Sequence, residues 1–150
     1  MIDRDHEQAI RHVLELAQGE LNMDVALLGE VVDGREVVRF TAGDAASFGV
    51  RTGASTPVEE TYCHRILEGR LPNAVADART DVTVRDLRVT KLAGVGSYIG
   101  VPLTARDARL YILCCLAHEA RPELGEADVR FLRGLAETVI DQLDHADDPA

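Results

Sequence analysis

Residues 94–103, GVGSYIGVPL, and residues 109–118, RLYILCCLAH, predict the two strands of one long hairpin at the centre of an antiparallel sheet. Residues 105–108 supply the exposed turn between them. Both strands are almost continuously apolar, which is typical of a sheet that is covered on both faces. The remainder of the chain must therefore provide helices or loops for each side of this hairpin.

The first strand of this hairpin presents different side chains to the two faces of the sheet, because successive residues of a strand alternate. Tyr98 and Gly100 share one face, and Ile99 and Val101 share the other. We expect Tyr98 and Gly100 to face a pocket, since a glycine beside a tyrosine leaves room for a ligand. Ile99 and Val101 are then expected to pack against helices.

Helices are predicted at both ends of the chain. Residues 3–20 and residues 126–145 each carry apolar side chains at helical spacing, with polar side chains opposite. A second hairpin follows the first helix, with strands at residues 24–32 and 35–43. Asp33-Gly34 joins them, and this pair suits a turn in which both central residues have positive φ.

The second strand of that hairpin alternates less clearly, and we expect it to lie near the edge of the sheet. Simple alternation places Val38 and Phe40 together on one face. A long connection, residues 44–55, follows it. Connections of this length are often functional or mobile, and the alternative is an ordinary surface loop.

A middle helix is predicted from the residues that start and stop helices. Thr56 suits the N-cap, Pro57 the first helical position and Glu59 a capping box, and Gly69 ends the helix after about residue 68. Cys63 falls on its apolar side. The densely charged residues 77–92 come next, and their apolar side chains indicate a short helix: Val84, Leu87 and Leu92.

Composition and charge exclude several classes of protein. The net charge of −10 disfavours nucleic acid and anionic lipid as partners. We find no apolar run long enough to cross a membrane and no apolar core of a secretory signal. The three cysteines lack CxxC spacing, which argues against a disulfide framework and a thiolate zinc site. We expect one cytoplasmic domain, residues 1–150, with residues 146–150 a disordered tail.

The order of elements indicates an α+β fold, and several stretches make a more specific resemblance. They are TYCHRILEGRLP from residue 61, GRLPNAVADA from residue 69, SYIGVPL from residue 97, RLYILCCLAHE from residue 109 and ELGEADVRFLRGLAETVIDQL from residue 123. Over nearly its whole length the chain resembles a GAF domain of bacterial signalling proteins, including those found with cyclic-di-GMP turnover modules.

The resemblance implies a five- or six-stranded antiparallel sheet. The first and last helices would cover one face and often form a homodimer interface. The other face would hold a small ligand beneath residues 44–69 and 77–93. The arginines of the second segment suit an anionic ligand, and the alternative is a solvated loop with local ion pairs. We select six candidate ligand-binding residues: Tyr62, Cys63, Asp77, Arg79, Arg85 and Tyr98.

Catalysis by the adjacent Cys63 and His64 is disfavoured. Neighbouring helical residues point about 100° apart, so the two side chains do not face each other. GAF domains that reduce free methionine sulfoxide resemble this chain at Cys63. They also need a cysteine just before the central hairpin, and residues 77–97 contain none. Cys114 and Cys115 point to opposite faces of the sheet. We therefore expect no catalytic residues and treat the reductase as the least favoured alternative.

No cofactor is expected. GAF domains that bind bilins place a Cys-His pair in the helix before the central hairpin, and relatives that bind haem place a histidine there, but residues 85–91 contain neither. His118 alone would be a poor metal site. The residue pattern of GAF domains that bind cyclic nucleotides is also absent.

Two functions remain. The first is a sensory domain that binds an unidentified small molecule and signals through its terminal helices. The alternative is a dimerisation module without a ligand, in which side chains fill the pocket. Either could be freestanding or part of a larger signalling protein.

Overall fold

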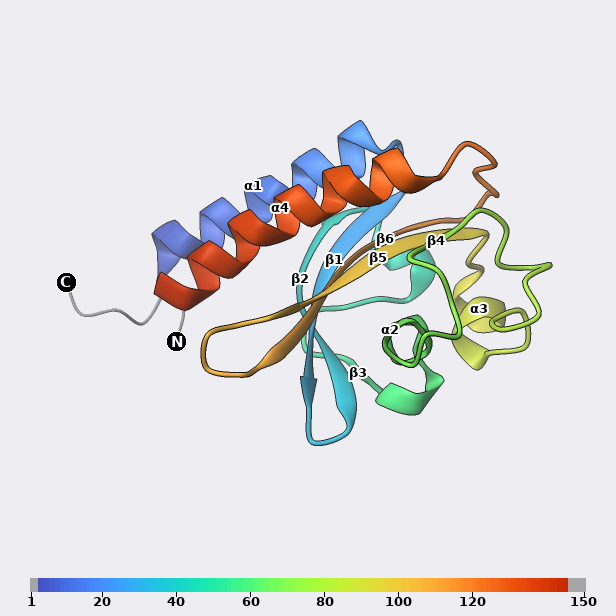
Figure 1. The fold of residues 1–150 in the computed structure, drawn as a ribbon, viewed down its shortest axis with the longest axis horizontal. Coiled ribbons are helices and arrows are strands. Elements are labelled where there is room, and N and C mark those ends of the chain that lie inside the picture. The colour runs from blue at the N-terminus through green and yellow to red at the C-terminus, as the bar shows by residue number, and fades with distance from the viewer. Residues whose placement is uncertain (1–2, 146–150) are drawn as a thin grey trace.

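The computed structural model describes residues 3–145, so the expected disordered tail at residues 146–150 lies outside the described residues. It contains one six-stranded antiparallel sheet in the order β3-β2-β1-β6-β5-β4 (Figure 1). The strands are β1 Val25–Val32, β2 Arg35–Gly43, β3 Ser55–Pro57, β4 Ala74–Val75, β5 Ser97–Thr104 and β6 Leu110–Ala117. The helices are α1 Arg4–Glu20, α2 Tyr62–Leu67, α3 Arg88–Ala93 and α4 Glu126–His145, with single 3₁₀ turns at Ala46–Phe48 and Val58–Glu60. The predicted α+β fold is confirmed.

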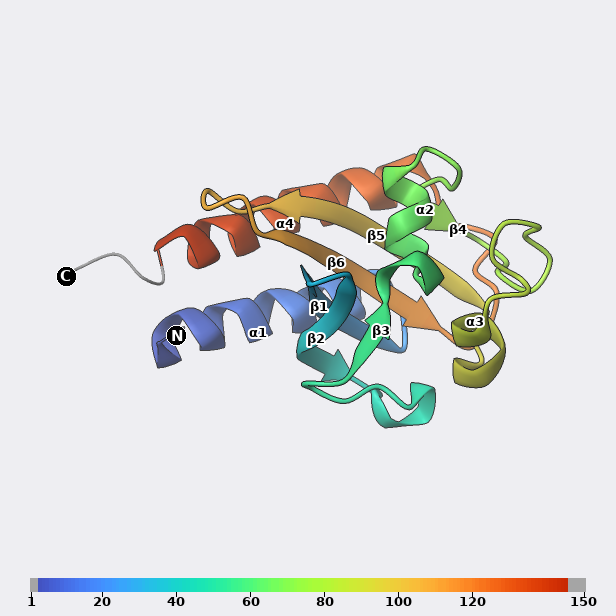
Figure 2. The same ribbon diagram turned by 90° about the horizontal axis from the view of Figure 1, so that it is seen from below.

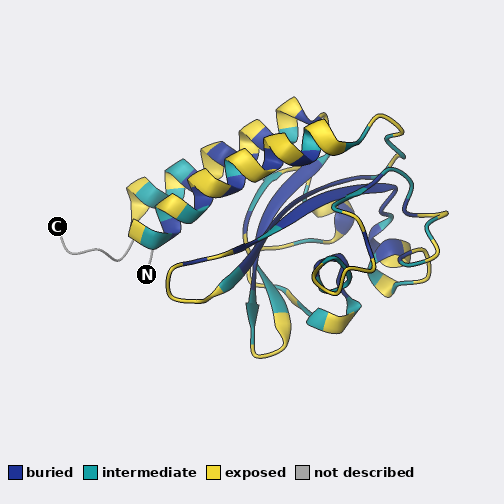
Figure 3. Ribbon diagram, viewed as in Figure 1, coloured by how far each residue is buried: buried dark blue, intermediate teal, exposed yellow. Residues whose placement is uncertain are grey.

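The sheet separates two layers. Helices α1 and α4 lie side by side across one face (Figure 1), and α2, α3 and the loops around them cover the other (Figure 2). Each layer has its own apolar core, and the central strands between them are buried on both sides (Figure 3). The continuous apolar character of β5 and β6 is explained by this double cover.

Local signals at the terminal helices agree with the structure. The Asp3 carboxylate accepts a hydrogen bond from the backbone N–H of His6 at 2.9 Å, which satisfies one of the free donors at the start of α1. The apolar stripes of α1 and α4 meet the sheet through fully buried side chains such as Leu14 and Leu132. No helix within residues 3–145 combines the length and the apolar character that a membrane crossing requires.

The central hairpin has the face assignment that the sequence predicts. Ile99 and Val101 of β5 belong to the core beneath α1 and α4, and Tyr98 belongs to the opposite core. The neighbouring cysteines of β6 divide in the same way, with Cys115 on the helix side and Cys114 on the other. Each central strand therefore contacts both layers.

The β1–β2 hairpin has the predicted turn but not the predicted alternation. Asp33 and Gly34 have φ of 51° and 76°, as a type I′ turn requires. A β-bulge at Arg39 then interrupts the pairing of the two strands, so that Arg39 has no opposite residue in β1. Leu28 pairs with Phe40, and the next residue of β1 pairs with Val38. Val38 consequently lines the face away from the terminal helices, while Phe40 packs beneath them. The prediction that they share a face was wrong.

The middle helix begins later than predicted. Thr56 and Pro57 belong to β3, where Thr56 pairs with Glu36, and the N-cap is Thr61. Its hydroxyl accepts the backbone N–H of His64 at 3.2 Å. The local capping signal at Thr56 is overridden because its backbone pairs with β2. The next short helix, α3, also starts later than its apolar residues suggest, at Arg88. Leu92, one of those apolar residues, is 76% exposed and does not belong to the core.

Candidate functional site

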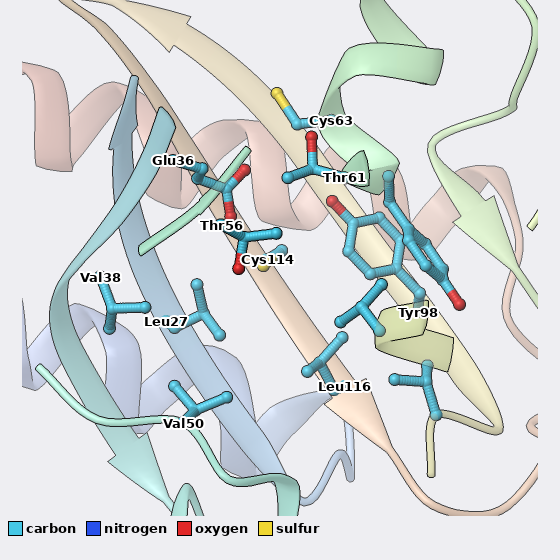
Figure 4. Close-up of a pocket in the computed structure, with 13 residues that line it drawn as sticks. Leu27, Glu36, Val38, Val50, Thr56, Thr61, Cys63, Tyr98, Cys114 and Leu116 are labelled. Carbon is cyan, nitrogen blue, oxygen red and sulfur yellow. The ribbon is translucent and has the colours of Figure 1, made fainter. Parts of the chain in front are cut away.

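A cavity of about 100 Å³ lies between the sheet and α2, on the face away from α1 and α4 (Figure 4). Side chains from β1, β2, β5 and β6 form its floor, and α2, α3 and the loops before β3 and β5 close it. Its walls are mostly apolar, and the residues that line it are Leu27, Glu36, Val38, Val50, Thr56, Thr61, Tyr62, Cys63, Val89, Val95, Tyr98, Cys114 and Leu116. Such a space is large enough for a few water molecules or a small organic molecule.

Hydrogen bonds fix the position of Tyr62 in the cavity wall. The Thr90 hydroxyl donates to the Val84 carbonyl at 2.7 Å, so the Tyr62 hydroxyl donates to Thr90 Oγ1. This chain of bonds ties the start of α2 to α3 and to the loop before it. Burial raises the pKa of Tyr62 to about 12, which keeps its phenol neutral.

The ring of Tyr98 packs against that of Tyr62, with centroids 4.6 Å apart and planes inclined by 44°. A Cβ atom at Gly100 would lie 2.3 Å from the Tyr98 hydroxyl oxygen. The absence of a side chain at Gly100 therefore accommodates Tyr98 itself, and the expectation that it leaves room for a ligand was wrong. Sequence spacing alone could not show that a neighbour two residues away folds over the glycine.

The two thiols in the cavity wall are poor nucleophiles. Burial raises the pKa of Cys63 to about 12, and burial raises that of Cys114 as well. Thiolate is the reactive form, so both groups stay inert near neutral pH. His64 points elsewhere, because its Nε2 lies 3.3 Å from the Glu68 carboxylate. Cys63 and His64 therefore point in different directions, and they do not form a nucleophile and base pair.

Glu36 is the charged residue of the cavity, and the sequence interpretation missed it. Within residues 3–145 its side chain makes no hydrogen bond or ion pair. Burial raises the pKa of its carboxyl group to about 7. A Cβ atom at Gly29 would lie 3.0 Å from Glu36 Cγ, so that glycine lets the side chain lie flat across β1. The sequence signal that could have identified it is the alternation of side chains along β2, which places Glu36 on the same face as apolar Val38.

Three of the six candidate ligand-binding residues meet at this cavity: Tyr62, Cys63 and Tyr98. The other three do not line it. Asp77 accepts the backbone N–H of Arg79 at 3.1 Å, and Arg79 donates to the carbonyl of His118 at 2.6 Å. Arg85 is half-exposed, with its Nε 3.6 Å from the Asp86 carboxylate. The charged segment therefore holds the end of β6 in place. Within residues 3–145, no arginine or lysine lines the cavity.

His118 has a structural place at the end of β6. Its Nδ1 donates to the Gly94 carbonyl at 2.8 Å, and its Nε2 lies 2.7 Å from the Ser47 hydroxyl. The ring stacks on Phe48 with centroids 3.8 Å apart. It thereby joins the loop after β2 to the start of β5. In the described part of the chain, no three His, Cys, Asp or Glu side chains are placed to hold a metal ion.

Comparisons with known proteins place the chain in a family. Solved structures with the same fold include the GAF domain region of a putative membrane protein from Geobacter sulfurreducens, with TM-score 0.69 and 22% identity over 93% of each chain. The blue-light absorbing form of the Thermosynechococcus elongatus PixJ GAF domain has TM-score 0.73 and 16% identity, over 95% of this chain and 86% of that one.

An enzyme shares the fold as well. Free methionine-R-sulfoxide reductase from Neisseria meningitidis, solved with its substrate, has TM-score 0.70 and 13% identity, over 91% of this chain and 77% of that one. These identities show a common fold and do not transfer an activity. No curated protein matches the chain. The family model for the GAF domain, however, matches residues 3–141. This protein therefore belongs to the GAF domain family.

Proposed function

We propose that this GAF domain is a sensory or regulatory module of bacterial signal transduction, which binds a small molecule in the cavity and signals through α1 and α4. The observation that carries the proposal is the apolar cavity beneath α2. A cavity filled by side chains would favour the dimerisation module. Ligand pockets are typically about 300–1,000 Å³, so about 100 Å³ favours a molecule much smaller than a chromophore or a nucleotide.

The strands offer a direct route from the cavity to the terminal helices. In β6 the neighbours Cys114 and Cys115 contact the cavity side and the helix side, so a shift of the strand affects both layers. The turn after β5 is bound to α4, where the backbone N–H of Arg106 donates to Asp144 Oδ1 at 2.6 Å. A ligand that prefers one position of these strands would shift the population of helix arrangements.

The proposed function does not include catalysis. The neutral thiols of Cys63 and Cys114 support this, as does the absence of a cysteine from residues 77–97. A cytoplasmic location is part of the same proposal. It is supported by three free cysteines, because a reducing compartment keeps thiols unpaired.

A screen of metabolites by thermal shift, followed by native mass spectrometry of the protein with each stabilising compound, tests this function. Val38→Phe places a larger side chain in the cavity and should abolish the shift. Val37→Phe is the matched control. Val37 is next to Val38 in β2 and is similarly buried, but its side chain points to the opposite face of the sheet. Failure of every metabolite to stabilise the protein, or equal binding by both variants, would count against a ligand site in this cavity.

Dimerisation through the terminal helices is favoured by two exposed apolar side chains. Leu16 of α1 is 40% exposed and Phe131 of α4 is 37% exposed. Apolar side chains on the outer surface of such helices suit a homodimer interface. Sedimentation velocity should show a dimer that Phe131→Glu dissociates, with Arg130→Glu as the control for added negative charge. A wild-type monomer at high concentration would rule this interface out.

A further inference from the structure

Glu36 gives the cavity one charged end. The other hydroxyl-bearing side chains of the cavity already have partners: Thr61 donates to the Val58 carbonyl at 2.6 Å, Tyr62 donates to Thr90, and Tyr98 is hydrogen-bonded to the Cys114 thiol. Among the described residues, Glu36 and Thr56 form no side-chain hydrogen bond. Figure 4 shows these two side chains together at the space between β2 and α2. Their oxygen atoms are therefore available to a bound molecule.

No cation within residues 3–145 neutralises this carboxylate. Arg35 and Arg88 line a neighbouring groove outside the cavity, and Arg35 already donates to Ser55 Oγ at 2.7 Å. The shift in the pKa of Glu36 accordingly comes from burial, without a contribution from a nearby charge. An ionised carboxylate that is partly desolvated and unpaired is unfavourable, and a bound cation would relieve that cost.

The groups that face Glu36 across the cavity remain neutral. They come from three different elements, namely Cys63 on α2, Tyr98 on β5 and Cys114 on β6. Burial raises the pKa of each, so none carries charge near pH 7. Among the described residues that line the cavity, Glu36 is therefore the one whose side chain can carry a charge near pH 7. The remaining walls, such as Leu27 and Leu116, are aliphatic.

Resting on the proposed function, we propose that the ligand class of this cavity is a small aliphatic amine whose ammonium group hydrogen-bonds the Glu36 carboxylate. Its apolar part, roughly four carbon atoms by the size of the space, packs against Leu27, Cys114 and Leu116. The Thr56 hydroxyl oxygen accepts a second hydrogen bond from the ammonium group. This ligand class replaces the anion expected from the sequence, because the arginines of the charged segment do not reach the cavity.

Three probes of similar size and different charge test the ligand class: isobutylamine, isobutanol and isobutyrate. Binding is followed by the backbone amide NMR shifts of β1 and β6 on ¹⁵N-labelled protein at pH 8, where Glu36 is largely ionised. A charge-assisted hydrogen bond should make the amine bind at least about tenfold tighter than the alcohol. The amine stays protonated between pH 6 and 8, so its affinity should fall about tenfold at pH 6 as Glu36 takes up a proton.

Glu36→Gln should remove the preference for the amine and its pH dependence. Glu60→Gln is the matched control, because Glu60 lines the neighbouring groove and not the cavity. Equal or tighter binding of isobutanol or isobutyrate, or an unchanged preference in Glu36→Gln, would overturn the amine as ligand class. If a metabolite without an amine binds in the cavity and isobutylamine does not, the amine proposal fails and the sensory function stands. If no probe and no metabolite binds, both fail.

Discussion

Alanine can replace Gly100 only if the ring of Tyr98 leaves its place in the cavity wall. The added Cβ would lie 2.3, 2.7 and 2.9 Å from the Oη, Cζ and Cε1 atoms of Tyr98. These distances are far below van der Waals contact, and Tyr98 is only 4% exposed, so its ring has little space in which to turn. We therefore expect Gly100→Ala to destabilise the protein and to alter the wall of the cavity.

The size of the effect follows from three contributions. Alanine is favoured over glycine in a strand by about 0.5–1 kcal/mol. Overpacking of a well-packed core costs about 1–3 kcal/mol. Separation of the Tyr62 and Tyr98 rings costs about 0.5–1.5 kcal/mol more. The net loss in the free energy of unfolding is about 2 kcal/mol, which lowers the midpoint of urea unfolding by about 1 M.

Urea unfolding followed by far-UV circular dichroism measures this loss, and the near-UV tyrosine signal reports the displaced ring. Gly134→Ala is the control, because nothing lies within 4 Å of its added Cβ on the exposed side of α4. It should stabilise the protein by about 0.5–1 kcal/mol. In a Tyr98→Leu background the cost of Gly100→Ala should largely disappear. Wild-type stability of Gly100→Ala, or an undiminished cost in that background, would refute the reasoning.

Three further outcomes follow from individual contacts. Because the folded pKa of Glu36 is raised from 4.5 to about 7, its contribution to stability is complete below pH 4.5 and is lost as the pH rises to about 7, by at most about 3 kcal/mol. Urea unfolding across this range should show that the free energy of unfolding of the wild type falls, relative to that of Glu36→Gln, as the pH rises. A difference between the two proteins that stays constant with pH would contradict this. Thr61→Ala removes the N-cap of α2 and should cost about 1 kcal/mol, with faster hydrogen exchange at the His64 amide; unchanged exchange there would show that the cap contributes little. His118→Phe keeps an aromatic ring against Phe48 but loses two hydrogen bonds, so chemical unfolding should show a loss of about 1–3 kcal/mol, whereas no loss would mean that stacking alone holds the ring.

The parts of the fold that were predictable depend on interactions between residues close in sequence. Helices α1 and α4 follow from their own apolar periodicity, and the turn at Asp33 and Gly34 follows from the backbone freedom of those two residues. The faces of β5 and β6 follow from strict alternation. Each of these signals is complete within one element, so no knowledge of the tertiary structure was needed.

Three of the errors arise from contacts between one element and another. Thr56 has every local feature of an N-cap, but pairing with Glu36 draws it into β3. Alternation along β2 fails at Arg39, because the bulge depends on how β2 is paired with β1. Arg79 carries a charge that suits an anion, but its guanidinium is bound to the carbonyl of His118. In each case the outcome depends on a partner outside the element that carries the local signal.

By itself, the sequence determined the class of fold, the two layers around the central hairpin and the inward direction of Tyr62, Cys63 and Tyr98. Periodicity and turn chemistry are local, and they suffice for those features. Only the tertiary structure decided what the cavity contains. It filled the space above Gly100 with the Tyr98 ring, kept the arginines outside and placed Glu36 inside across Gly29. The charge in the cavity beside GVGSYIGVPL thus comes from Glu36 in the other hairpin, because strand pairing brings together side chains that are far apart in the chain.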